Sequence, residues 1–272
     1  MFTIQAVWDD SLAFMRRERA LLVPLALATL GLGNMVIAMA QAEPSANPAD
    51  PTALALQVLV LLAAIWMAIG KLGLITLALR SHCSVGEALR HGGARLGIYL
   101  ITALMIGVIF GLLFAPVVPQ FAPYLTQLQH NDFTHIHLAR WARLWIAVVA
   151  IFVMYVSTRL FVLEAVVVDR KGNPLELLKQ SFQATRGVFW RLLLFTLGFS
   201  VFALILAAAV AASFGTLFAI LGKLIDTPFT GKVLEALVQS VLTAGLGMIE
   251  AVFTAKAYQR LTGATTMASI FK

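Results

Sequence analysis

Four ionisable side chains lie within otherwise apolar stretches of this 272-residue chain: Lys71, Arg159, Glu164 and Glu250. Charges inside a membrane are costly, so such residues are candidates for a functional site. Two bases and two acids could pair at a polar centre and line a path for an ion or a lipid headgroup. Alternatively, the bases could snorkel to the inner interface and pair with the acids there. Span length favours snorkelling, because residues 53–79 would form a helix of about 40 Å against a hydrocarbon core of about 30 Å.

A second polar group lies in a segment between two apolar stretches and contains His130, Asp132, His135 and His137. Imidazole and carboxylate side chains bind zinc and other transition metals. The spacing matches no dedicated metal site, and polar loop residues commonly have no ligand. We therefore expect no metal and no other cofactor, and the three histidines are the candidates if a metal does bind.

Motifs of common enzyme classes are absent from the sequence. It contains no Walker loop, no HExxH, no GxSxG and no paired-cysteine motif. Cys83 is the single cysteine, so an internal disulfide and a zinc cluster of cysteines are both excluded. We expect a protein without enzymatic turnover, although a catalytic pair assembled only by the fold stays open.

The composition predicts a membrane protein, because 60% of the residues are hydrophobic and only 12% are charged. Stretches long enough to cross a bilayer predict an all-α fold with one membrane domain over residues 1–272. The six expected spans are 20–40, 53–79, 96–118, 144–168, 192–212 and 233–255. Ala40-Gln41-Ala42 after the first span also fits a cleavable signal peptide, but Asp9 and Asp10 are unusual in such a leader, and we expect the span to be retained.

The distribution of Lys and Arg predicts the orientation of these spans. Placing both termini in the cytoplasm puts fourteen bases in cytoplasmic segments and four outside. The net charge of +7 then reflects topology and attraction to anionic lipid headgroups, and we expect no nucleic-acid partner. The bases expected to contact headgroups or a protein partner are Arg90, Arg95, Arg170, Lys171, Lys179, Arg186 and Arg191.

The segments between the spans carry their own signals. Three prolines indicate a loop over 41–52. A second loop is expected over 214–230, where Pro228 should prevent one continuous helix. Residues 80–95 are expected to form a basic loop. Gly107 and Gly111 are spaced for close helix packing, which we expect to be intramolecular.

A short amphipathic helix is predicted after the fourth span. Asn173, Pro174 and Glu176 stand at the N-cap, N1 and N3 positions of a helix start, and Gly187 is a stop signal. The apolar and charged positions between them lie on opposite faces. We expect this helix to lie on the inner membrane surface.

A weaker copy of this pattern occurs 89 residues earlier. Ser84 and Glu87 repeat the cap, and a pair of glycines at 92–93 is expected to end that helix early. The same shift places Lys71 within one residue of Arg159. With an amphipathic helix at residues 1–19, three surface helices are expected, and three parallel units of about 1–79, 80–168 and 169–258 are possible.

Residues 165–172 (AVVVDRKG) and 177–186 (LLKQSFQATR) resemble the YciC-like bacterial inner-membrane proteins. That family is related to the membrane domain of some glycerophosphodiester phosphodiesterases. The resemblance implies a polytopic inner-membrane protein connected with envelope maintenance, and it implies no established activity. Where the family often has further bases beside the serine, this chain has Gln180 and Gln183 around Ser181.

Together these observations predict a non-enzymatic inner-membrane protein that associates with lipids or partners and supports envelope organisation. Its surface helices would contact anionic headgroups, or a membrane or cytoplasmic protein. The alternative is a transporter or channel for an ion or small amphiphile that uses the four intramembrane charges. A polar cavity that reaches these charges would favour transport.

Overall fold

The computed structural model describes residues 2–42, 51–80, 83–121, 139–225 and 227–263. These residues form helices and contain no strand, which confirms the expected all-α class for the described part of the chain. Six helical stretches among them are long and apolar enough to cross a membrane. The prolines of the 41–52 segment, apart from Pro51, lie outside the described residues.

The N-terminal region consists of a separate helix followed by the first span. α1 (Ile4–Arg17) begins at Thr3, whose hydroxyl accepts a hydrogen bond from the Ala6 amide. The span comprises α2 (Arg19–Ala26), a π-helical turn η1 (Leu27–Gly31) and α3 (Leu32–Ala42). Because π-helical geometry leaves carbonyls without helical partners, the Trp66 indole can donate to the Ala28 carbonyl at 2.9 Å.

The second and third spans are α4 (Pro51–Leu79) and α5 (Val85–Phe114), which pack against each other. The expected loop over 80–95 is wrong, because α5 begins at residue 85 and continues through both Gly92 and Gly93. Gly92 permits close helix approach instead of ending the helix. A Cβ atom there would lie only 3.0 Å from the backbone nitrogen of Gly73.

The fourth span is broken near its end. α6 (Val118–Phe121) precedes it, and α8 (Arg140–Arg159) is separated by a turn at residues 160–162 from α9 (Leu163–Asp169). The expected span 144–168 is therefore two helices. The turn changes the direction of the chain, and α9 packs against α4 and α5.

The last third of the chain has two long spans. After α10 (Pro174–Ala184) come α11 (Phe189–Val210), a π-helical turn η3 (Ala211–Gly215) and α12 (Thr216–Leu224). α13 covers Pro228–Thr262. The expected loop over 214–230 is mostly helical, but it is not one continuous helix, because α12 ends at Leu224 and Pro228 begins α13, where a missing N–H is tolerated.

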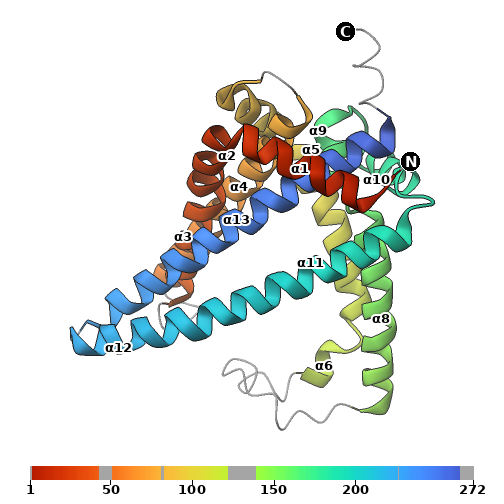
Figure 1. Ribbon diagram of the computed structural model, residues 1–272. Coiled ribbons are helices and arrows are strands. Elements are labelled where there is room, and N and C mark those ends of the chain that lie inside the picture. The colour runs from red at the N-terminus through yellow and green to blue at the C-terminus, as the bar shows by residue number, and fades with distance from the viewer. Residues whose placement is uncertain (1, 43–50, 81–82, 122–138, 226, 264–272) are drawn as a thin grey trace.

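Figure 1 shows α1, α9, α10 and the last turns of α13 at one end of the molecule, and α6 and α12 at the opposite end. We call the first of these the α10 end. The buried core lies there and includes Leu72–Ala78 of α4, Val162–Val168, and Ala251–Ala255 of α13. The opposite halves of the spans are largely exposed, and α11 diverges from α8 (Figure 1).

The expected packing at Gly107 and Gly111 is wrong. An added Cβ atom at either glycine would meet nothing within 4 Å, so no helix approaches them in the described part of the chain. Close packing occurs instead at Gly70, where a Cβ atom would collide with Thr29. Sequence spacing alone does not distinguish a packing glycine from an exposed one.

Both predicted helix starts form. The Ser84 amide donates to Glu87 at 3.0 Å, and the Asn173 amide donates to Glu176 at 3.2 Å. Gly187 has a φ of +91° in the turn after α10, a conformation that favours glycine. The second expected surface helix is nevertheless not separate, because α5 continues into its span, and the threefold repeat stays a prediction.

Candidate functional site

Three of the four predicted intramembrane charges meet in one cluster. Lys71 Nζ lies 2.9 Å from an oxygen of Glu164 and 3.2 Å from an oxygen of Glu250. The Tyr99 hydroxyl donates to Glu164 at 3.3 Å. The cluster therefore joins α4, α5, α9 and α13, and with one base and two carboxylates it carries a formal charge of −1.

Lys71 pairs with acids, as both interpretations expected, and its snorkelling to the inner interface stays a prediction. Lys71 lies eight residues before the end of α4 at Leu79, which corresponds to about 12 Å along the helix. Its side chain is 25% exposed and turns to the two carboxylates. It pairs there because the turn at 160–162 brings α9, and with it Glu164, against α4.

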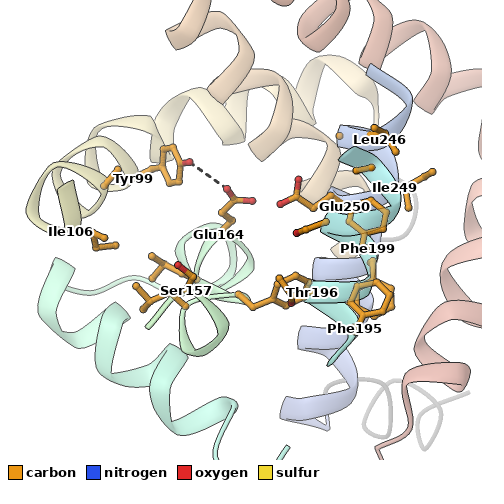
Figure 2. A pocket seen from close by; sticks show the side chains of 18 of the residues that line it. Tyr99, Ile106, Ser157, Glu164, Phe195, Thr196, Phe199, Leu246, Ile249 and Glu250 are labelled. Carbon is orange, nitrogen blue, oxygen red and sulfur yellow. Dashed lines mark hydrogen bonds between the residues drawn. The ribbon is translucent and has the colours of Figure 1, made fainter. Parts of the chain in front are cut away.

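A pocket of about 760 Å³ adjoins this cluster and is lined by residues of α5, α8, α9, α11 and α13. Most of the lining is apolar, and both Glu164 and Glu250 contribute to it. Figure 2 shows the two carboxylates extending from different helices toward each other. The pocket volume is within the range of about 300 to 1,000 Å³ that is typical of small-molecule sites.

Phenylalanine rings form one side of the pocket. Phe195 stacks on Phe253 with ring centroids 3.8 Å apart and an angle of 9° between the planes. Phe199 stacks on Phe195 with ring centroids 5.9 Å apart, and Phe161 meets Phe253 edge-on at 6.0 Å. These contacts fix α11 to the α10 end of α13.

Hydroxyl groups are the other polar components of the lining: Tyr99, Ser157, Thr196, Ser200 and Thr243. The Thr196 oxygen is buried and has no hydrogen-bond partner among the described residues. Unpartnered buried polar atoms are uncommon and call for a physical explanation. A bound molecule with a polar group is one such explanation.

Arg159, the fourth predicted charge, lies apart from the cluster. Its guanidinium carbon is 5.4 Å from the ring centre of Tyr155 and 5.1 Å from that of Phe189. Its Nε and Nη1 atoms are buried and lack hydrogen-bond partners among the described residues. Cation–π contacts with two rings therefore replace the ion pair that the sequence predicted.

The backbone at Arg159 has a role that the sequence did not indicate. Its carbonyl accepts hydrogen bonds from the hydroxyls of Ser181 at 3.0 Å and Thr185 at 3.3 Å. Both hydroxyl residues are buried on α10. α10 is thereby attached to the end of α8, and its Leu177 packs in the core.

The predicted headgroup contacts all lie on segments at the α10 end. Six are exposed and Arg95 is partly buried; the exposed ones are Arg90, Arg170, Lys171, Lys179, Arg186 and Arg191. Two of them also have intramolecular partners. Arg170 donates to the Tyr258 hydroxyl at 3.1 Å, and Arg191 donates to the Phe2 carbonyl at 2.6 Å.

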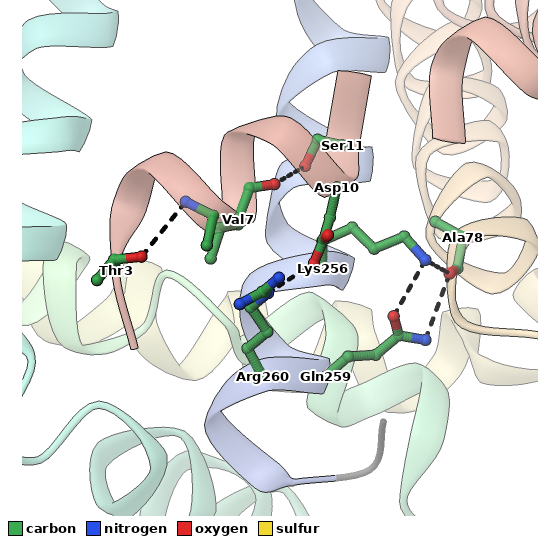
Figure 3. Close-up of polar contacts among 9 residues, drawn as sticks. Thr3, Val7, Asp10, Ser11, Ala78, Lys256, Gln259 and Arg260 are labelled. Carbon is green, nitrogen blue, oxygen red and sulfur yellow. Dashed lines mark hydrogen bonds and ion pairs between the residues drawn. The ribbon is translucent and has the colours of Figure 1, made fainter. Parts of the chain in front are cut away.

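Further polar contacts hold α1 and α4 to α13 (Figure 3). Arg260 pairs with Asp10 of α1 at 2.6 Å. Lys256 donates to the Ala78 carbonyl at 2.9 Å, and Gln259 donates to the Leu79 carbonyl at 3.1 Å. These donors satisfy carbonyls that the end of a helix leaves unpaired.

No group of three potential metal ligands occurs among the residues that the structure describes. His130, His135 and His137 lie outside those residues. Sequence patterns did not predict a role for Tyr99, Thr196 or the phenylalanines of the pocket. Their neighbours are apolar or aromatic, so nothing distinguishes them from ordinary span residues.

A family model described as a domain of unknown function, DUF7847, matches residues 2–261. No curated protein and no solved structure matches the chain. Because the family model matches nearly the whole sequence, the chain belongs to the DUF7847 family.

Proposed function

We propose that this chain is a non-enzymatic protein of the bacterial inner membrane that binds an amphiphilic lipid and supports envelope organisation. The observation that carries the proposal is the pocket of about 760 Å³, which is mostly apolar but has carboxylates at one side. An apolar site with a few convergent polar groups is the usual form of a small-molecule site. A molecule with an alkyl body and a polar headgroup matches both parts.

Two glycines of α5 allow a matched test of lipid binding. Gly107 lines the pocket, whereas Gly111, one turn further on, does not. A Cβ atom has open space at both positions. Gly107→Leu should therefore fill the pocket and Gly111→Leu should leave it open, with the same added volume on the same helix.

Mass spectrometry of lipids that co-purify with each variant provides the measurement. We expect Gly107→Leu to lose a lipid species that the unmodified chain and Gly111→Leu both retain. Equal lipid content in all three proteins would contradict binding in this pocket. Thermal unfolding of both variants checks that the fold is intact.

Cytoplasmic N- and C-termini are part of the proposal. Support comes from the concentration of bases on segments at the α10 end. In membrane proteins, the cytoplasmic segments carry an excess of Lys and Arg. This end would then face anionic headgroups of the inner leaflet. The likeness of residues 165–186 to the YciC-like proteins also supports an inner-membrane location.

Cys83 allows this orientation to be tested, because it is the single cysteine and lies between α4 and α5 at the α10 end. A membrane-impermeant maleimide should label it in inverted vesicles and not in intact spheroplasts. Desolvation and the Glu87 carboxylate raise the pKa of the Cys83 thiol, so labelling should increase above neutral pH. Ala139→Cys in a Cys83→Ser background should show the opposite sidedness, and labelling of Cys83 from outside would contradict the orientation.

Transport of an ion or small amphiphile is the second candidate. It is favoured by one observation: both carboxylates of the Lys71 cluster adjoin the pocket. In proteoliposomes, transport predicts movement of an acyl-labelled phosphatidylethanolamine between leaflets, measured by dithionite quenching and reduced in Glu250→Gln. Binding alone predicts exchange no faster than in protein-free liposomes.

A further inference from the structure

We infer that the pocket selects amphiphiles whose headgroup is an ammonium ion, bound at the carboxylates of Glu164 and Glu250. This inference rests on the proposed function, because it requires that the pocket binds an amphiphile. It adds the chemical class of the headgroup, which the lipid-binding proposal leaves open.

The charge of the site is the first argument. Lys71 is shared by two carboxylates, so one negative charge of the cluster is uncompensated. Among the described residues that line the pocket, there is no lysine, arginine or histidine. A net charge in apolar surroundings is unfavourable, and a cationic headgroup would neutralise it.

The geometry gives the headgroup access to this charge. Lys71 is not part of the pocket lining, whereas both carboxylates are. The Glu250 side chain is 43% exposed, against 18% for Glu164. A headgroup in the pocket therefore meets acceptor oxygens, with Glu250 the more accessible of the two residues (Figure 2).

The aromatic and hydroxyl groups of the lining complement the same ligand. Phe195, Phe199 and Phe253 line the same pocket as the carboxylates and supply apolar aromatic surface for an alkyl chain. Ser157, Ser200 and Thr243 add hydroxyl groups to the lining, and a hydroxyl oxygen can accept a hydrogen bond from an ammonium N–H. Most of the remaining lining is apolar and suits an alkyl chain.

Other headgroups fit less well. A phosphate or sulfate would place like charges together at the carboxylates, which is unfavourable in a site of low dielectric constant. A neutral alcohol could donate one hydrogen bond but would leave the excess charge uncompensated. The structure therefore predicts the order ammonium, alcohol, anion for headgroups on the same alkyl chain.

Photoaffinity labelling of the full chain in maltoside micelles tests this order, because neutral micelles do not concentrate cations. The probes are diazirine-bearing dodecylamine, dodecanol and dodecyl sulfate, with labelled residues identified by mass spectrometry. We expect dodecylamine to label pocket residues at concentrations about tenfold lower than dodecanol, as expected for one desolvated charge pair. Gly107→Leu should abolish pocket labelling by every probe, and Gly111→Leu should not.

Glu250→Gln tests the headgroup step separately. It removes the excess negative charge and leaves Lys71 paired with Glu164, so the fold should be retained. The ratio of dodecylamine labelling to dodecanol labelling should fall by about tenfold. Glu235→Gln, on the same helix and outside the pocket, is the matched control.

The outcomes separate the two proposals. Equal labelling by dodecylamine and dodecanol in the unmodified chain would overturn the ammonium selectivity and leave lipid binding in place. Absence of pocket labelling by any probe, or labelling unaffected by Gly107→Leu, would overturn lipid binding itself. The comparison of probes on the unmodified chain needs no variant, so the inference stays testable even if Glu250→Gln does not fold.

Discussion

Lys71 and Arg159 are each a base inside an apolar span, and an 89-residue shift nearly superposes them in the sequence, yet their surroundings differ. Lys71 contacts two carboxylates, whereas Arg159 lies between two aromatic rings. Glu164 is only five residues from Arg159 in the sequence but pairs with Lys71. Sequence proximity and an internal repeat therefore do not determine which charges meet.

The turn at residues 160–162 explains the difference. It ends α8 at Arg159 and directs α9 against α4, so Glu164 faces Lys71 while Arg159 stays on the side of α11. The two bases also suit their sites chemically. An ammonium is a compact point charge that can bridge two carboxylates, whereas a planar guanidinium stacks on aromatic rings.

Among the variants that test this comparison, removal of Lys71 should have the largest effect on stability. Lys71→Met leaves the Glu164 and Glu250 carboxylates together without a base. Because Lys71 and Glu164 are partly buried and the Glu250 side chain is 43% exposed, we expect the free energy of unfolding to fall by about 3 kcal/mol, the lower limit for breaking a fully buried pair. Denaturant unfolding in micelles measures it. Adding Glu164→Gln and Glu250→Gln to the same chain should recover most of the loss, and a single variant as stable as the unmodified chain would show that the ion pairs contribute nothing.

Loss of the contacts between α10 and Arg159 should have the next largest effect. Ser181→Ala with Thr185→Val removes both hydroxyls that donate to the Arg159 carbonyl. At about 1 kcal/mol for each hydrogen bond, unfolding should become easier by about 2 kcal/mol. Hydrogen exchange should accelerate in α10 and not in α4; unchanged exchange in α10 would mean that Leu177 packing alone holds the helix.

Tyr99→Phe tests the smaller polar contact of the Lys71 cluster. It removes the hydroxyl that donates to Glu164 and keeps the ring, so we expect a loss of about 1.5 kcal/mol, typical of a hydrogen bond to a charged group. Thermal unfolding measures this loss. Tyr155→Phe, beside Arg159, is the control, because a cation–π contact needs the ring and not the hydroxyl.

Arg159→Gln should have the smallest effect, about 1 kcal/mol, because cation–π contacts are of that order and two buried nitrogens without partners are removed with them. Lipid movement in proteoliposomes should be unchanged. A loss of stability as large as that of Lys71→Met would mean that Arg159 has a charged partner, and the contrast between the two bases would be lost.

Several features of the fold could be predicted from the sequence because their causes are local. Hydrophobic spans follow from composition, and the caps at Ser84 and Asn173 follow from side chains that bond amides three residues away. The errors occur where a local signal has two meanings. Gly92 was expected to end a helix and residues 214–230 to form a loop, but Gly92 permits helix contact and most of 214–230 is helical.

The charged residues of the candidate site were also predictable, since a charge within an apolar span can be recognised in the sequence. Lys71, Glu164 and Glu250 were identified in this way, but the sharing of Lys71 by both acids and the separation of Arg159 were not. The pocket was not predictable, because its phenylalanines and hydroxyls have the same residue types as lipid-facing positions.

The sequence by itself determined that this chain is helical, that six stretches can cross a membrane, and which charges those stretches contain. Only the tertiary structure decided that one lysine is shared by two acids beside an apolar pocket, while an arginine is stacked between rings. The physical reason is that helix formation and hydropathy depend on near neighbours, whereas pairing of charges depends on the helix rotations and the turn at 160–162 that bring distant residues together.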